Sequence, residues 1–166
     1  MIHSRAIDLS FAAELRSRIY SLPITTGTAR MLELEDRGTE LWNLATSLRR
    51  DQNVDANWKN ALCLLRIFAF FLIDSSYSDR VHSLDKCVRL LKIAFKSAED
   101  CFDQQDLGFA VKVLERAARY VEIISNEITN VSPDDVPVCE RLKAEYFFQR
   151  ITLVSRTALL CQSSNV

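Results

Sequence analysis

The chain has 166 residues, of which 48% are apolar and 26% are charged, and 21 basic side chains nearly balance 22 acidic ones. This composition provides for a hydrophobic core and excludes a disordered chain, while the near-zero net charge gives no sign of the clustered basic face that binds DNA or RNA. Only three glycines and three prolines occur, so a strand-rich fold with many tight turns is disfavoured.

Arg49-Arg50 is the one basic doublet in the chain, and Asp51 follows it directly. Positive charge is favourable at the C-terminal end of a helix, so we interpret the doublet as a solvated helix end. A nuclear-import signal or a phosphate-binding site is the alternative. We expect no direct contact with nucleic acid.

The five cysteines are widely spaced, odd in number and contain no C-x-x-C pair. A zinc site needs ligands that converge at two points, and this spacing supplies none. Each cysteine lies in or beside an apolar stretch, where a reduced thiol behaves as a small hydrophobic side chain. We expect buried structural thiols in a reducing compartment, the cytosol or nucleus. These residues are Cys63, Cys87, Cys101, Cys139 and Cys161.

No segment is expected to enter a membrane. The first twenty residues carry charges throughout and lack the apolar core of a signal peptide. The most apolar run, residues 61–73, is too short to cross a bilayer and contains Arg66. Such a run is typical of a helix that is packed on most of its faces.

The N-terminal half of the sequence predicts three helices. The first covers residues 6–20 and is followed by a short linker with a proline and a glycine. The second covers 29–50, where the mid-helix Gly38 indicates the close approach of a neighbouring backbone, or a bend. The third covers 54–73, and the polar residues 74–79 are expected to end it.

Three further helices are predicted in the C-terminal half, at residues 80–102, 107–128 and 138–160. Asp106 is placed to cap the start of the second of these. Residues 130–137 contain two prolines among turn-forming residues and form the clearest loop. Short connections between helices imply antiparallel neighbours.

The predicted fold class is therefore all-α, with antiparallel helix pairs stacked as a segment of a degenerate, tetratricopeptide-like solenoid. Residues 1–28 form an N-terminal helix and linker, residues 29–161 form the repeat-like segment, and residues 162–166 form a frayed tail.

The repeat pattern is clearest in the predicted helices at 80–102 and 107–128. Ala98, Ala110, Leu114 and Ala117 give the small and large positions by which paired repeat helices approach closely. The tryptophan, glycine and tyrosine of the repeat consensus are absent, and Glu122 stands where its terminal proline would be. A simple bundle with chance alanines is the alternative.

A second and longer unit is indicated where Trp42 and Ala45 lead through a short turn into Trp58 and Ala61. The positions expected to pack one helix against another are Gly38, Trp42, Ala45, Ala98, Ala110, Leu114 and Ala117.

The segment Glu35–Arg50 carries a resemblance to a known family, and its Gly38–Asn43 core, Gly-Thr-Glu-Leu-Trp-Asn, is the most specific part. It resembles the opening helix of the fungal meiotic tetratricopeptide scaffolds, the sporulation-specific "zipper" crossover family with a testis-expressed counterpart in animals. The stretches 62–66, 86–92 and 117–120 fit less distinctively. The resemblance spans about residues 34–160.

This resemblance implies a chromosome-associated nuclear scaffold that joins recombination factors to the synaptonemal complex in meiosis. It carries over no catalytic residue and no cofactor. Members of the family are much longer than this chain, which would then be a fragment near the N-terminal end or a truncated gene product. Partner surfaces on later repeats would be missing.

The residues themselves offer little for catalysis. His3 and His82 are the only histidines, and no nucleophile-elbow, metalloprotease or phosphate-loop motif is present. The acidic stretch around Arg37 could in principle act in acid–base or metal chemistry, but solvated charges on a helix face are the simpler interpretation. Its members are Glu33, Glu35, Asp36 and Glu40. We predict no catalytic, cofactor-binding or metal-binding residue and no enzyme.

Two aromatic groups allow two interpretations, core packing between helices or a docking surface for a further repeat or partner helix. These groups are Phe68, Phe70 and Phe71, and Tyr146, Phe147 and Phe148. An array that exposes a repeat edge is expected to self-associate or to be poorly soluble. Possible contacts to a partner protein are Asn43, Arg50, Arg66, Lys92 and Arg119.

The leading functional hypothesis is thus a non-catalytic protein–protein interaction scaffold. A self-contained regulatory helical bundle that dimerises is the alternative, and a helical lyase or hydrolase that uses the acidic stretch is the third hypothesis.

Overall fold

The computed structural model describes residues 13–18, 28–50, 56–77, 83–130 and 132–163, and within them it contains helices and no strand. The prediction of an all-α chain is confirmed for these residues. The chain forms two compact units, residues 1–80 and residues 81–166, so the predicted repeat-like segment 29–161 contributes to both. Most of the predicted first helix, and both histidines, lie outside the described residues.

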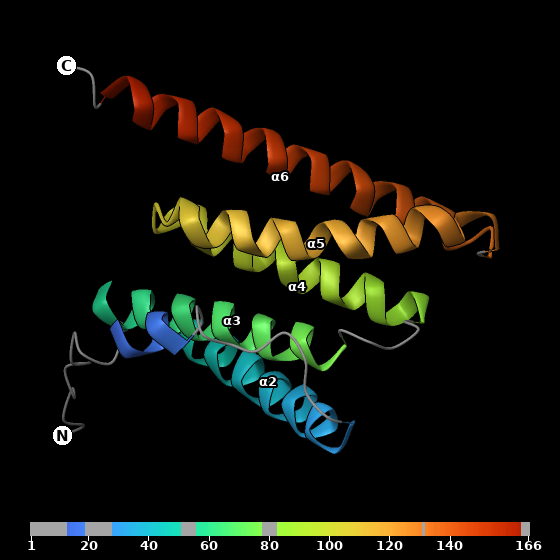
Figure 1. Ribbon diagram of the computed structural model, residues 1–166, viewed down its shortest axis with the longest axis horizontal. Coiled ribbons are helices and arrows are strands. Elements are labelled where there is room, and N and C mark those ends of the chain that lie inside the picture. The colour runs from blue at the N-terminus through green and yellow to red at the C-terminus, as the bar shows by residue number, and fades with distance from the viewer. Residues whose placement is uncertain (1–12, 19–27, 51–55, 78–82, 131, 164–166) are drawn as a thin grey trace. The chain divides into compact units, whose positions relative to one another are not determined.

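The first unit is built on the pair of helices α2 (Thr28–Arg49) and α3 (Ala56–Ser76), which pack against each other (Figure 1). The two helices approach each other closely at Gly38 of α2. A Cβ atom built there would lie 2.6 Å from Ile73 Cγ1 and 3.0 Å from the Ala69 carbonyl oxygen. Only a residue without a side chain allows the backbones to come this near.

Two polar contacts fix the same pair. The Arg66 guanidinium of α3 lies 4.5 Å from the centroid of the Trp42 ring of α2, a cation–π contact between buried side chains. The Tyr77 hydroxyl donates a hydrogen bond to the Glu35 carboxylate. Beside them, Ala45 is 1% exposed and completes the inner face of α2.

Helix α3 continues to Ser76, and the prediction that it ends at Ile73 is wrong. Asp74, Ser75 and Ser76 are polar but buried, and the Ser76 hydroxyl donates to the Ile73 carbonyl oxygen at 2.6 Å. Because this bond satisfies the hydroxyl within the last turn, Ser76 does not need to leave the helix to reach water.

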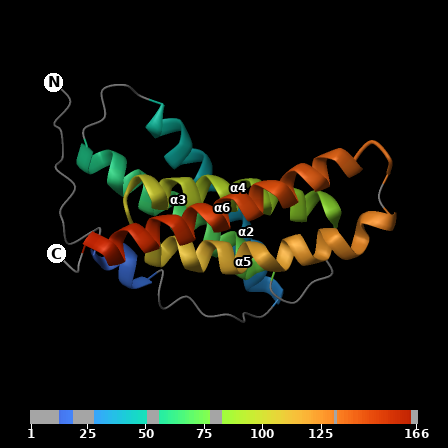
Figure 2. The same cartoon turned by 90° about the horizontal axis from the view of Figure 1, so that it is seen from above.

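The second unit contains α4 (Leu84–Asp103), α5 (Leu107–Glu127), the 3₁₀ turn η1 (Ile128–Asn130) and α6 (Val136–Ser163). Helices α4 and α5 form a tight pair, and α6 packs against both. Figure 2 shows α6 running obliquely across the α4–α5 pair. The predicted packing positions of this unit are fully buried: Ala98 on α4, and Ala110, Leu114 and Ala117 on α5.

The α4–α5 turn has a well-defined hydrogen-bond pattern. The Asp106 amide donates to the Cys101 carbonyl and the Gln105 amide to the Phe102 carbonyl, at 2.9 and 3.1 Å, which together form a Schellman motif. Gln105 adopts the left-handed conformation, with φ 57°, where glycine is usual. Asp106 then caps α5, accepting from the Phe109 amide at 3.3 Å, as the sequence predicted.

The loop before α6 is shorter than predicted, because α6 begins at Val136 and includes Pro137. Proline is tolerated in a first helical turn, where its missing N–H would have had no partner within the helix. Helix α6 also extends to Ser163, so Gln162 and Ser163 are helical. The last three residues lie outside the described part of the chain.

None of the five cysteines forms a disulfide bond, and four of them, all except Cys161, are buried. Burial raises the pKa of the Cys87 thiol to about 11. Burial, followed by the nearby carboxylates of Asp135 and Glu140, also raises the pKa of the Cys139 thiol. These two thiols therefore stay protonated near neutral pH and act as packing groups.

Candidate interaction surface

The polar residues that could support chemistry are engaged in ordinary surface and packing contacts. Arg37 of the acidic stretch forms an exposed ion pair with Glu40 at 3.0 Å, and Glu35 accepts from Tyr77. Among the described residues, no group of three or more histidine, cysteine, aspartate or glutamate side chains is placed to hold a metal ion. No helix within these residues is long and apolar enough to cross a membrane.

The five predicted partner contacts are divided between the two units, with three residues in the first and two in the second. Asn43 and Arg50 are exposed on α2 and just beyond its end, Lys92 is exposed on α4, and Arg119 is half-buried on α5. Arg66 is only 6% exposed and lies over the Trp42 ring, so it stabilises the α2–α3 pair and is not available to a partner. Its location within a strongly apolar run is the physical reason for this burial.

The structure also separates the two aromatic groups noted in the sequence. Phe70 is 0% exposed and Phe71 is 6% exposed, so they belong to the core. Tyr146 is buried as well, whereas its neighbours Phe147 and Phe148 are 57% and 63% exposed. Within α6, therefore, Tyr146 lies on a buried face of the helix, whereas Phe147 and Phe148 lie on an exposed face.

The inner face of α6 packs against α4 and α5. Its buried residues recur at the three- and four-residue spacing of one helical face. They are Cys139, Leu142, Tyr146, Gln149 and Leu153.

The opposite face of α6 is also apolar but is open to solvent. Phe147, Phe148, Ile151 and Val154, here named the outer stripe, are 57%, 63%, 65% and 65% exposed. Scattered single apolar residues are normal on a protein surface, but a row of four large ones on one helical face is typical of an interaction site.

A shallow groove of about 270 Å³ runs along this face. Phe147, Ile151 and Val154 line it together with Arg150 and Ser155. The groove therefore combines apolar walls with one guanidinium group at its edge. Such a surface suits an apolar side chain that enters from a neighbouring helix, as ridges enter grooves in helix packing.

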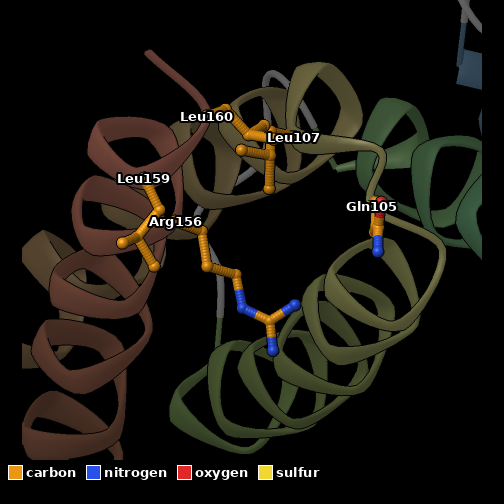
Figure 3. A pocket seen from close by; sticks show the side chains of 5 residues that line it. All are labelled: Gln105, Leu107, Arg156, Leu159 and Leu160. Atoms are coloured by element: carbon orange, nitrogen blue, oxygen red, sulfur yellow. The ribbon is translucent and has the colours of Figure 1, made fainter. Parts of the chain in front are cut away.

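A second hollow, of about 300 Å³, lies between the last turns of α6 and the α4–α5 turn. Figure 3 shows Leu107 beside Leu160 on one side, with Leu159 and Gln105 on opposite sides of the opening. The Arg156 side chain reaches across, and its Nη1 donates to the Phe102 carbonyl oxygen at 2.7 Å. This bond places a cation at the C-terminal end of α4, where it is favourable, and ties the distal half of α6 to α4.

Comparison with known proteins identifies no relative: no protein-family model matches the chain, and neither a curated protein nor a solved structure is significantly similar to it.

Sequence reasoning noted Phe147 and Phe148 but missed Ile151, Val154 and Arg150. The signal was present, because α6 contains two apolar series on different faces, one through Tyr146 and Leu153 and the other through Phe147 and Ile151. A helix that is buried on one side needs only one apolar series, so the second series indicates a further contact face.

Proposed function

We propose that this chain is a non-catalytic protein–protein interaction scaffold. The single observation that carries the proposal is the outer stripe of α6, four large apolar side chains that are each more than half exposed. Covering a helix face of this kind with a partner is favourable, because each Å² of apolar surface that is buried lowers the free energy by about 25 cal/mol.

The arrangement of the second unit supports a solenoid-like interpretation. Helices α4 and α5 pack as a pair and carry the fully buried small residues Ala98, Ala110 and Ala117, and α6 packs on that pair while presenting an apolar outer face. In a helical repeat array, each repeat covers the apolar face of its neighbour. In this proposal α6 is the first helix of a further pair, and the outer stripe is the face that a following helix or a partner covers.

The resemblance of Gly38–Asn43 to the meiotic tetratricopeptide scaffolds suggests the biological setting. We propose that the partners are recombination or synaptonemal-complex proteins, and that the chain works in the nucleus in association with chromosomes. Five cysteines without a disulfide bond, four of them buried, support a reducing compartment of this kind.

The proposal is tested by affinity capture from meiotic cells, using the full chain as bait and mass spectrometry to identify what is bound. Three baits are compared: the wild type, Ile151→Asp in the outer stripe, and Ser132→Asp, which adds the same charge at an exposed turn position. We expect the wild type and Ser132→Asp to retain recombination or synaptonemal-complex proteins and Ile151→Asp to lose them. Capture of proteins from an unrelated pathway would contradict the meiotic setting, and capture that does not depend on Ile151 would contradict the surface.

The alternative function, a regulatory bundle that dimerises, is favoured by the same exposed stripe. Sedimentation velocity of the purified chain separates the two. A concentration-dependent dimer that Ile151→Asp converts to a monomer would replace the scaffold proposal with this alternative.

A further inference from the structure

We propose, building on the scaffold function above, that the outer stripe of α6 binds an amphipathic helix whose apolar face is flanked by carboxylates. The inference comes from the charges around the stripe. From Tyr146 to Ser163, α6 carries Arg150 and Arg156 and no acidic residue. Arg156 is held by the Phe102 carbonyl, whereas Arg150 forms part of the groove wall beside Ile151 and Val154.

The carboxylates nearest to the stripe are already engaged within α6. Glu140 pairs with Lys143 at 3.0 Å, and Glu145 accepts from the Gln149 side-chain amide at 3.0 Å. Arg141, by contrast, is exposed, and it forms no ion pair with another described residue. The local acidic groups therefore do not neutralise the arginines that border the stripe.

Arg141 and Arg150 lie on opposite sides of the stripe. They are separated by about two and a half helical turns, a spacing that turns the two side chains to opposite flanks of one helix. Viewed along the axis of α6, the outer stripe points in a direction between these two flanks. An occupant that places apolar side chains on the stripe thus meets a guanidinium group on each flank, and glutamate or aspartate at its own flanks complements both.

A second copy of this chain fits the same surface less well. An antiparallel two-fold contact centred on Ile151 brings Arg150 of each copy next to Arg150 of the other, and like charges at a contact oppose association. Neither copy supplies an unengaged carboxylate from its α6 at that place. The charges therefore favour a different, acidic helix.

The geometry of the groove favours a helix over a membrane surface. The groove is a hollow of about 270 Å³ between side chains one turn apart, which accepts single apolar side chains at helical spacing. Binding to an anionic bilayer is served instead by many basic residues along a polar face. In α6, Arg150 lines the groove, and Arg141 lies on the other flank, more than one helical turn before Phe147.

The test is a selection with the full chain as the immobilised target and a displayed library of amphipathic helices as the probe. Each helix is about six turns long and has leucines fixed on one face. Glutamate, glutamine and lysine are supplied equally at the flanking positions. We expect the wild type to enrich glutamate over lysine about tenfold. Arg150→Glu should shift the enrichment at the facing flank towards lysine, and Ile151→Asp should end enrichment altogether.

The outcomes separate this inference from the function on which it rests. Enrichment that depends on Ile151 but shows no preference for glutamate would overturn the acidic partner and leave the interaction surface standing. Loss of all Ile151-dependent binding, in the selection and in cell capture alike, would overturn both. Two further results would assign the stripe to another occupant: an Ile151-dependent dimer in sedimentation velocity, or Ile151-dependent binding to phosphatidylcholine vesicles only when they contain phosphatidylserine.

Discussion

Replacing Gly38 by alanine places a methyl group where α2 and α3 are in close contact. Its Cβ atom would lie 2.6 Å from Ile73 Cγ1, 3.0 Å from the Ala69 carbonyl oxygen and 3.1 Å from the Ile73 amide nitrogen. The Ile73 side chain can rotate away. The two backbone atoms belong to helix α3 and cannot, so the helices must separate slightly along their contact.

The size of the effect follows from two opposing terms. Overpacking a well-packed contact costs about 1–3 kcal/mol, and alanine in place of glycine inside a helix contributes about 1 kcal/mol in the opposite direction. Because the close atoms include backbone, we place the cost towards the upper end of its range and expect Gly38→Ala to lower the free energy of unfolding by about 1–2 kcal/mol.

Gly108→Ala is the matched control, because Gly108 is exposed near the start of α5. This variant should be neutral or stabilising by up to about 1 kcal/mol. The assay is urea unfolding followed by tryptophan fluorescence, which reports on the first unit, since both tryptophans of the chain, Trp42 and Trp58, belong to it. For Gly108→Ala, helical circular dichroism gives the unfolding curve. Gly38→Ala that stabilises the chain as much as the control would refute the close approach of α2 and α3.

Other predictions concern the second unit. Asp106→Ala should lower the free energy of unfolding by about 1 kcal/mol through loss of the α5 cap, as measured by urea unfolding, with the exposed Asp134→Ala unchanged as control. Gln105→Gly should raise it by about 1 kcal/mol because the left-handed conformation then carries no strain, and a destabilised variant would contradict this conformation. Cys161, the one exposed thiol, should react with a thiol reagent at neutral pH before the four buried thiols, and equal rates would contradict their burial. Stability should fall as pH rises from 9 to 11, because the folded state holds the Cys87 proton more tightly than the unfolded state, and Cys87→Ala should lack this part of the pH dependence.

Much of the fold could be predicted because local signals agree with it. The Asp106 cap, the small residues of the α4–α5 pair and the mid-helix Gly38 are each tied to a local requirement of a helix or a helix contact. The errors lie at helix ends. Pro137 was assigned to a loop although proline is compatible with a first helical turn, and the buried Ser76 was assigned to a turn although its hydroxyl can be satisfied within the helix.

The surface was harder to predict because it depends on which neighbours a helix has. Arg66 was expected to face a partner, and its position over Trp42 depends on how α2 and α3 cross. In α6, Leu153 and Ile151 are equally apolar in sequence, yet Leu153 is 6% exposed and Ile151 is 65% exposed. Only the position of α4 and α5 decides which of them becomes core.

That difference between two neighbouring residues offers the sharpest test of the interaction surface. The measurement compares Ile151→Asp with Leu153→Asp in urea unfolding followed by helical circular dichroism, together with binding to a glutamate-flanked helix from the library. We predict that Ile151→Asp changes the free energy of unfolding by no more than about 0.5 kcal/mol and abolishes binding, since it alters only exposed surface. We also predict that Leu153→Asp unfolds the second unit by burying a charge. Equal destabilisation by the two variants, or binding that survives Ile151→Asp, would contradict the assignment of the outer stripe as a partner site.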